Sequence, residues 1–264
     1  MGNETGPFGR RVRLHVPEGP PDVVRESEFP PYAYGVLQAA VLAHNLGIPA
    51  ITVAELGVAG GNGLVELERL GARIGESTGV DIAPVGFDLG TGMPDPRDYR
   101  DMPYIWQRGF FTMDETQLRS KLHRAELVTG DIGVTGAAYL RTGPAPIGFL
   151  SFDLDYYSST AVAMNALLDG PTSRYLPRVF CYFDDTVGPH AELHSPFTGE
   201  LLAIDEFNAS RSDRKLAPVH GLRYKLLPFE GPWVAGFYVL HVFEHKLYGT
   251  YVFHEDDRQF PLGS

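Results

Sequence analysis

The feature that most constrains the fold of this chain is the alternation of short apolar runs with segments of helical periodicity. Five runs rich in β-branched or aromatic residues predict buried strands, at residues 51–56, 80–87, 126–129, 147–152 and 179–183. Apolar residues at helical spacing predict helices at residues 32–46, 64–70, 115–124, 159–168 and 201–209. Strands that alternate with helices favour an α/β fold with a mostly parallel sheet covered on both faces.

The two ends of the chain depart from this alternation. Residues 222–227, 233–243 and 247–253 predict late strands, of which the last two would form an antiparallel hairpin around His245. Residues 1–30 are rich in proline and glycine, and we expect an arm or lid with little regular structure there. Residues 31–264 are predicted to form one domain.

The composition excludes several classes of partner. With 22 basic and 33 acidic residues, the net charge is −11, which disfavours binding to nucleic acid or to an anionic membrane. The longest apolar stretch, residues 36–60, is interrupted by polar residues and a proline, so we expect no membrane span. The single cysteine, Cys181, cannot form an intrachain disulfide and is predicted to be a buried, inert thiol. We therefore expect a cytoplasmic protein, and the composition leaves a homo-oligomer open.

Acidic residues stand at the end of every predicted parallel strand. They are Glu55, Asp88, Asp131, Asp153 with Asp155, and Asp184 with Asp185. Ligands of open parallel sheets bind outside the carboxyl ends of the strands. Any single aspartate of this kind can equally be a helix cap, but the whole series favours a functional site at this edge. Residues 95–111 and 186–198 are predicted as long loops at the same edge.

The strongest local motif is a glycine-rich turn after the first strand, Glu55-Leu-Gly57-Val-Ala-Gly60-Gly61-Asn-Gly63. Its glycines do not have the G-x-G-x-x-G spacing of a dinucleotide site, which argues against an NAD-dependent oxidoreductase. The carboxylate of Glu55 would repel a pyrophosphate, whereas it could pair with the cationic amino group of a methionine moiety. The turn therefore favours S-adenosylmethionine over NAD.

Four further motifs carry a resemblance to a known family. They are Val85-Gly-Phe-Asp-Leu-Gly-Thr-Gly-Met-Pro94, Ser151-Phe-Asp-Leu-Asp-Tyr-Tyr-Ser-Ser-Thr160, Tyr182-Phe-Asp-Asp185 and Asp205-Glu-Phe207. In this order, over about residues 32–210, they resemble class I methyltransferases and most closely the macrocin O-methyltransferase family. The resemblance implies a Rossmann-like fold with a seven-stranded, mostly parallel sheet. It also implies an enzyme that transfers a methyl group from S-adenosylmethionine to a hydroxyl of a small molecule, a sugar or a glycosylated natural product.

The resemblance also implies roles for individual residues at the cofactor. Glu55 and the glycines would hold the methionine end, Asp88 would accept the ribose hydroxyls, and Asp131 would lie near the adenine. Asp81 competes with Asp88 for the ribose, but the residues around Asp88 match the family better. The cofactor-binding residues expected in this way are Glu55, Gly57, Gly61, Gly63, Asp88, Asp131 and Asp153.

A divalent cation is the second ligand that the resemblance implies, held by Asp153, Asp184 and Asp185. Three carboxylates leave room for water and a substrate diol around Mg²⁺, which would lower the pKa of a bound hydroxyl. Without a metal, the clustered carboxylates repel one another, and the pKa of at least one of them should rise. Asp153 and His190 are the candidate catalytic residues, with His194 as a further loop histidine. Asp155 is expected to begin a turn or to contact the substrate.

The chain also departs from the family pattern. Leu176-Pro177-Arg178 stands where the family has a Gly-Gly turn, and Ser158 stands where it commonly has a glutamate. These departures leave the methyl acceptor open. The aromatic residues of the 95–111 loop would either line the acceptor site or only cover the sheet. A catalytically inactive, small-molecule-binding module on the same fold is the alternative, and the retained carboxylates argue against it.

Overall fold

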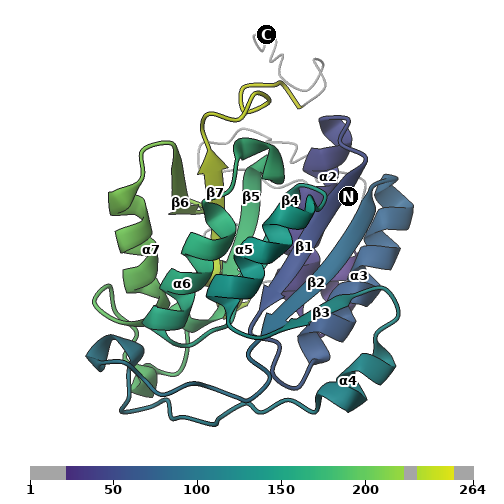
Figure 1. Ribbon diagram of the computed structural model, residues 1–264. Helices are drawn as coiled ribbons and strands as arrows, with labels where there is room; N and C mark the ends of the chain where they lie inside the picture. Colours follow the sequence, from purple (N-terminus) through teal and green to yellow (C-terminus); the bar gives the residue numbers. More distant parts are fainter. Residues whose placement is uncertain (1–21, 223–230, 253–264) are drawn as a thin grey trace, which may run out of the picture.

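Seven strands form one twisted sheet in the computed structural model of this chain, which describes residues 22–222 and 231–252 (Figure 1). The strand order is β3-β2-β1-β4-β5-β7-β6. The strands are β1 (Ala50–Leu56), β2 (Asp81–Asp88), β3 (Glu126–Thr129), β4 (Ile147–Phe152), β5 (Tyr175–Phe183), β6 (Arg214–Pro218) and β7 (Phe237–Val242). The first five are parallel to one another, and β7 runs antiparallel to both β5 and β6. The predicted seven-stranded, mostly parallel sheet is therefore confirmed.

Helices cover both faces of this sheet (Figure 1). They are α1 (Asp22–Glu26), α2 (Pro30–Asn45), α3 (Asn62–Thr78), α4 (Glu115–Lys121), α5 (Ile132–Thr142), α6 (Tyr157–Leu168) and α7 (Gly199–Ser210). One buried cluster joins α2 and α3 to the side chains of Ile51 and Val53 in β1, and a second joins α5, α6 and α7 to Ala54 and Leu56 of the same strand. Because β1 is buried on both sides, its sequence up to Glu55 is apolar except for Thr52.

The antiparallel pair near the C-terminus contains one of the two predicted strands. β7 lies within the strand predicted at residues 233–243, but its partner is β6, whereas residues 247–252, the described part of the other predicted strand, form turns and irregular structure. The hairpin around His245 is therefore wrong in position. The strand β6, Arg-Lys-Leu-Ala-Pro, has a single large apolar residue, Leu216, which leaves little periodicity to detect. Of the strand predicted at residues 222–227, Leu222 lies in a turn and the rest lies outside the described residues.

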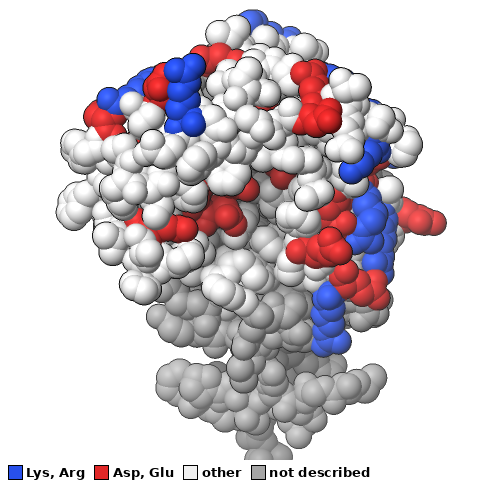
Figure 2. All heavy atoms as spheres, turned by 90° about the horizontal axis from the view of Figure 1, so that it is seen from below, with Lys and Arg blue, Asp and Glu red and all other residues white. Residues whose placement is uncertain are grey.

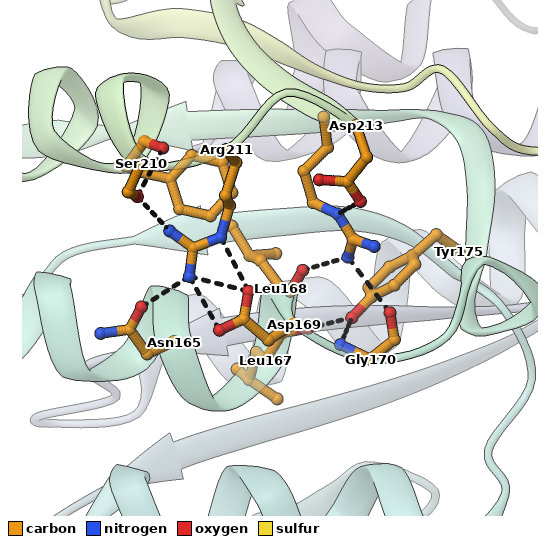
Figure 3. Close-up of polar contacts among 11 residues, drawn as sticks. Asn165, Leu167, Leu168, Asp169, Gly170, Tyr175, Ser210, Arg211 and Asp213 are labelled. Carbon is orange, nitrogen blue, oxygen red and sulfur yellow. Dashed lines mark hydrogen bonds and ion pairs between the residues drawn. The ribbon is translucent and has the colours of Figure 1, made fainter.

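Polar contacts rather than an apolar run hold the start of β6 in place (Figure 3). The buried guanidinium of Arg214 donates to the backbone oxygens of Leu168 and Gly170 at the end of α6, and it pairs with Asp213. Next to it, Arg211 pairs with Asp169 at 2.7 Å and donates to Asn165 at 2.7 Å. These contacts explain how a weakly apolar segment becomes an edge strand.

The N-terminal segment is partly folded onto the domain. Val23 and Val24 of α1 are buried in the cluster under α2, and Arg73 of α3 pairs with Glu26 at 2.6 Å. Regular structure thus begins inside the predicted arm, whose residues 1–21 lie outside the described part, and the domain boundary at residue 30 stays a prediction. Within the described ranges, no helix has the length and apolarity needed to cross a membrane.

The carboxyl ends of the parallel strands meet at the lower edge of the sheet in Figure 1, where the long connections after β2 and β5 also lie. The two loops predicted at residues 95–111 and 186–198 belong to these connections, and they contain the short 3-10 turns Tyr99–Asp101 and His190–Glu192. Tyr104 of one loop donates to the backbone oxygen of Glu192 in the other at 2.8 Å. Seen from below, acidic side chains gather around a hollow in this face (Figure 2).

Candidate active site

The glycine loop, residues 57–61, connects β1 to α3 and is shaped by contacts within the protein. Gly57 and Gly61 have φ angles of +90° and +88°, which few other residues adopt. A Cβ at Gly57 would overlap the backbone oxygen of Asp153, and one at Gly63, in the first turn of α3, would overlap Oε1 of Glu55. The glycines of the motif thus let the backbone of β1 and α3 approach Asp153 and Glu55 closely.

Asp88, at the end of β2, organises the same loop. Its Oδ2 accepts from the backbone nitrogens of Val58 and Ala59, both at 2.9 Å, and its Oδ1 accepts from Gly90 at 2.6 Å. Asp81, the competitor for the ribose role, lies at the opposite end of β2 and pairs with Arg124 at 3.0 Å. Of the two aspartates, only Asp88 is at the carboxyl edge of the sheet.

Glu55 is the buried acid of the site, with 3% of its surface exposed. Its Oε1 accepts from the hydroxyl of Tyr32 at 2.8 Å, and its Oε2 is buried without a hydrogen-bond partner among the described residues. Burial raises the pKa of Glu55 to about 8, although the bond from Tyr32 opposes the shift. A buried acceptor oxygen that lacks a hydrogen bond would be satisfied by a cationic donor.

The three predicted metal ligands come together as the carboxylate cluster: Asp153, Asp184 and Asp185. One oxygen of each lies within 4.8 Å of the others. Asp153 and Asp184 are open to solvent, whereas Asp185 is 7% exposed. Desolvation by the dense surroundings and then the charges of Asp185 and Asp184 raise the pKa of Asp153 well above its ordinary range. Burial and the charge of Asp184 raise the pKa of Asp185 to about 6. Such mutual repulsion is what a bound divalent cation would relieve.

Two further acids support Asp185 from the protein side. Asp155, in a left-handed conformation with φ of +56°, donates its backbone N–H to Oδ2 of Asp185 at 2.8 Å. Burial, then the charge of Asp185, raises the pKa of Asp155 to about 8. Glu200, in the first turn of α7, is fully buried and accepts from the backbone N–H of Asp185 and from the hydroxyl of Thr160. Sequence reasoning missed Glu200, because it lies outside every motif and strand end.

Tyr182 is a second residue that sequence reasoning left without a role. It lies two positions before Asp184, and its hydroxyl donates to Oδ1 of that carboxylate at 2.7 Å. In the sheet, Glu55, Ser151 and Tyr182 are direct neighbours across β1, β4 and β5. Strand alternation puts the three side chains on one face, the face that α2 covers.

The loop histidines differ in their surroundings. His190 is exposed, and no contact described for it reaches the carboxylate cluster. His194 lies 2.8 Å from Oε2 of Glu192, and its charge lowers the pKa of Asp185. Of the two, His194 is the histidine that acts electrostatically on the cluster.

Asp131 lies after β3, as predicted, and caps α5. Its Oδ1 accepts from the backbone N–H of Gly133 at 2.7 Å. This contact is sufficient to explain an aspartate at this position, and its place near an adenine stays a prediction.

The 95–111 loop is hydrogen-bonded to Ser158 of α6, the position at which the family commonly has a glutamate. The backbone N–H and hydroxyl of Ser158 donate to the fully buried carboxylate of Asp101 at 2.7 and 2.8 Å. Large apolar side chains of this loop and of the 186–198 loop stay exposed, namely Tyr99, Tyr104, Phe110, Phe111, Leu193 and Phe197. The loop therefore presents aromatic rings to solvent at the edge that carries the carboxylates.

The same architecture occurs in solved methyltransferase structures. No protein-family model matches the sequence, and a search of curated proteins found none similar to it. The chain is similar to the structure of CalS11, described as a calicheamicin methyltransferase, with 20% identity and a TM-score of 0.50 over 88% of this chain and 97% of that one. It is also similar to the O-methyltransferase NovP, with 18% identity and a TM-score of 0.50 over 69% of this chain and 72% of that one.

These likenesses and the strand order define the class of fold. The chain has the Rossmann-like fold of class I methyltransferases, as the sequence motifs predicted. Its antiparallel β7 is inserted between β5 and β6, which differs from the strand order 3-2-1-4-5-6 of dinucleotide-binding proteins. The fold thus agrees with the glycine spacing in disfavouring an NAD-dependent oxidoreductase.

Proposed function

We propose that this protein is an S-adenosylmethionine-dependent O-methyltransferase that methylates a hydroxyl of a sugar or a glycosylated natural product, with the assistance of Mg²⁺. One observation carries the proposal: the carboxylate cluster directly adjoins the glycine loop. The backbone N–H of Asp153 donates to Leu56 at 2.9 Å, and its backbone oxygen abuts Gly57. A methyl donor on the loop and a hydroxyl at the cluster would therefore be neighbours. Both similar structures are of proteins named as methyltransferases.

The residues of the glycine loop fit S-adenosylmethionine, which when bound supplies a methyl group on a sulfonium. The unpartnered Oε2 of Glu55 suits the ammonium of its methionine end, with Gly57, Gly61 and Gly63 giving the backbone close approach. The Oδ1 of Asp88, which accepts one hydrogen bond from Gly90, would face the ribose hydroxyls. Asp131 would lie beside the adenine.

The carboxylate cluster fits Mg²⁺, a cation that prefers oxygen ligands and supplies Lewis acidity when bound. Asp153, Asp184 and Asp185 would hold it. Asp155 keeps Asp185 in place through its backbone, and Tyr182 does the same for Asp184 through its hydroxyl. An incoming hydroxyl would thus meet fixed ligands.

Transfer of the methyl group requires that the acceptor hydroxyl lose its proton. We assign this step to Asp153, because it adjoins both the glycine loop and the other two carboxylates. His190 is the second candidate, and it would have to act from the exposed 186–198 loop. Substitution of each residue by a non-ionising one separates the two assignments.

The acceptor itself would lie against the exposed aromatic side chains of the two loops. Tyr99, Tyr104 and Phe111 offer flat apolar faces of the kind that stack on sugar rings and on attached aromatic groups. This supports a small hydroxylated substrate rather than a nucleic acid or a membrane, in keeping with the net charge of −11. We expect the reaction to take place in the cytoplasm.

Isothermal titration calorimetry with S-adenosylhomocysteine and NAD tests the cofactor class. We expect S-adenosylhomocysteine to bind, NAD not to bind, and Asp88→Ala to weaken binding at least tenfold. Asp81→Ala is the matched control, because it removes an aspartate from the far end of the same strand. Absence of binding to folded wild-type protein would overturn the proposal. Binding without methylation of any sugar or phenol acceptor, with or without Mg²⁺, would indicate an inactive binding module.

A further inference from the structure

The hydroxyl of Tyr32 has a role that the motifs at the strand ends do not reveal. Tyr32 lies in the first turn of α2, is 3% exposed, and donates to Oε1 of Glu55 at 2.8 Å. Its ring is held by the edges of Phe149 and Tyr182, with centroids 5.8 and 6.5 Å away, and by Phe29 at 5.3 Å. A ring packed on three sides cannot swing away, so its hydroxyl is fixed in direction.

The Glu55 carboxyl group is confined by this contact. Its Oε1 lies between the Tyr32 hydroxyl and the Cα of Gly63, so closely that a Cβ at position 63 would overlap it. Because Oε1 is engaged, the group presents Oε2, which is buried without a partner in the described part of the chain.

A buried carboxylate oxygen without a partner is costly unless a ligand or water meets it. Such an oxygen accepts, which suits a donor with several N–H groups and a positive charge. A primary ammonium has both properties, whereas a hydroxyl or an amide lacks the charge. The Oε2 atom of Glu55 therefore fits the amino group of an amino-acid moiety.

We propose that Tyr32 is the positioning residue that directs Glu55 Oε2 towards the ammonium of the bound cofactor. The inference rests on the proposed function, and it adds a residue of α2 to a site otherwise built from strand ends.

The test compares two ligands that differ only in the amino-acid end, S-adenosylhomocysteine and 5′-methylthioadenosine. In Tyr32→Phe, which removes one hydroxyl, we expect the affinity for S-adenosylhomocysteine to fall about 5- to 20-fold. The affinity for 5′-methylthioadenosine should change less than about twofold, because that ligand has no ammonium. Glu55→Gln, which keeps the size but removes the charge, should repeat this pattern. Tyr34→Phe, on the same helix against Trp233 and Phe237, is the control and should bind both ligands normally.

The outcomes separate the two proposals. Wild-type protein that binds neither ligand overturns the proposed function and the role of Tyr32 with it. Wild-type protein that binds S-adenosylhomocysteine while Tyr32→Phe binds it equally well overturns the role of Tyr32 alone. If the affinities for both ligands fall equally in Tyr32→Phe and in Glu55→Gln, the role of Tyr32 is also overturned, because this result would indicate general damage to the pocket. Thermal unfolding of each variant would detect such damage.

Discussion

The backbone N–H of Asp155 donates to the Oδ2 of Asp185 at 2.8 Å, so the turn after β4 holds a carboxylate that follows β5 in place. Asp155 adopts a left-handed conformation to do so, and its own side chain is buried. Backbone strain at a non-glycine residue persists where surrounding contacts maintain it. Here it fixes one ligand of the carboxylate cluster before any cation arrives.

Metal binding should depend on the cluster as a unit. Asp153→Asn, Asp184→Asn and Asp185→Asn should each weaken Mn²⁺ binding at least tenfold, measured by calorimetry or by the electron paramagnetic resonance of free Mn²⁺, because each removes one charged oxygen ligand. Asp95→Asn removes an exposed carboxylate of the 95–111 loop and should leave Mn²⁺ affinity unchanged. Equal Mn²⁺ affinity in all four variants would exclude a cation site at the cluster.

Methyl transfer, if it depends on that cation, should stop in EDTA and return with Mg²⁺. We expect at least a hundredfold loss of kcat on chelation, since the acceptor hydroxyl would then keep its ordinary pKa. The measurement is methylation of an accepted sugar or phenol at fixed cofactor concentration. Full activity in EDTA would leave the carboxylates as proton acceptors without a metal.

The pH dependence of stability should carry the signature of Glu55. Its pKa rises from 4.5 to about 8 on folding, so the native state favours the protonated form. The stability linked to this group is therefore fully present below pH 4.5 and is lost as the pH rises towards 8. Glu55→Gln should remove this loss and flatten the slope of unfolding free energy by up to about 1.4 kcal/mol per pH unit.

Urea unfolding of wild type and Glu55→Gln between pH 5 and 8 measures the effect, with S-adenosylhomocysteine absent. Glu76→Gln, on the outer side of α3, gives the control for loss of an exposed glutamate. Parallel slopes for wild type and Glu55→Gln would mean that Glu55 titrates normally in the folded protein.

Gly63 should tolerate no side chain, in contrast to Gly60. A Cβ at Gly63 would overlap Oε1 of Glu55 and approach the Tyr32 ring, so Gly63→Ala should displace the carboxylate and abolish measurable binding of S-adenosylhomocysteine. At Gly60, a Cβ would meet no heavy atom within 4 Å and the φ angle is ordinary, so Gly60→Ala should bind within about threefold of wild type. Similar losses in both variants would contradict this account of the loop.

The edge strand β6 should depend on Arg214. Arg214→Ala removes the donors to the buried carbonyl of Leu168 and the half-buried carbonyl of Gly170, which should cost about 2–4 kcal/mol of unfolding free energy. Arg108→Ala breaks an exposed ion pair with Asp95 and should cost less than about 0.5 kcal/mol. Chemical denaturation of both variants decides the point, and equal stability of Arg214→Ala and wild type would show that β6 does not depend on Arg214.

Local patterns predicted the parts of the fold that local physics governs. Strands β1 and β4 are buried along almost their whole length, because both faces of the sheet are covered there, and such mostly apolar runs can be recognised in the sequence. The acids at their ends converge because parallel strands share one carboxyl edge. The meeting of Asp153, Asp184 and Asp185 agrees with that rule, and the family resemblance singled these three out from the row.

The elements that were not predicted from the sequence are held by residues that lie far away along the chain. β6 has little apolar periodicity and is fastened through Arg214 to the end of α6, 44 to 46 positions earlier in the chain. The helix α5, which the sequence pattern did not predict, begins at the Asp131 cap and has a mixed composition with two threonines and two interior glycines. In both cases tertiary contacts decide the conformation where local propensity is weak.

By itself, the sequence determined the alternating α/β architecture, the glycine turn and the row of acids at the strand ends, because each arises from the periodicity or the spacing of neighbouring residues. Only the tertiary structure decided which groups complete the site. Tyr32 reaches Glu55 across 23 positions, and Glu200 reaches Asp185 across 15, through contacts that no local pattern encodes. Burial then set the protonation of these acids, since desolvation depends on the atoms that fold around a carboxyl group and not on its neighbours in the chain.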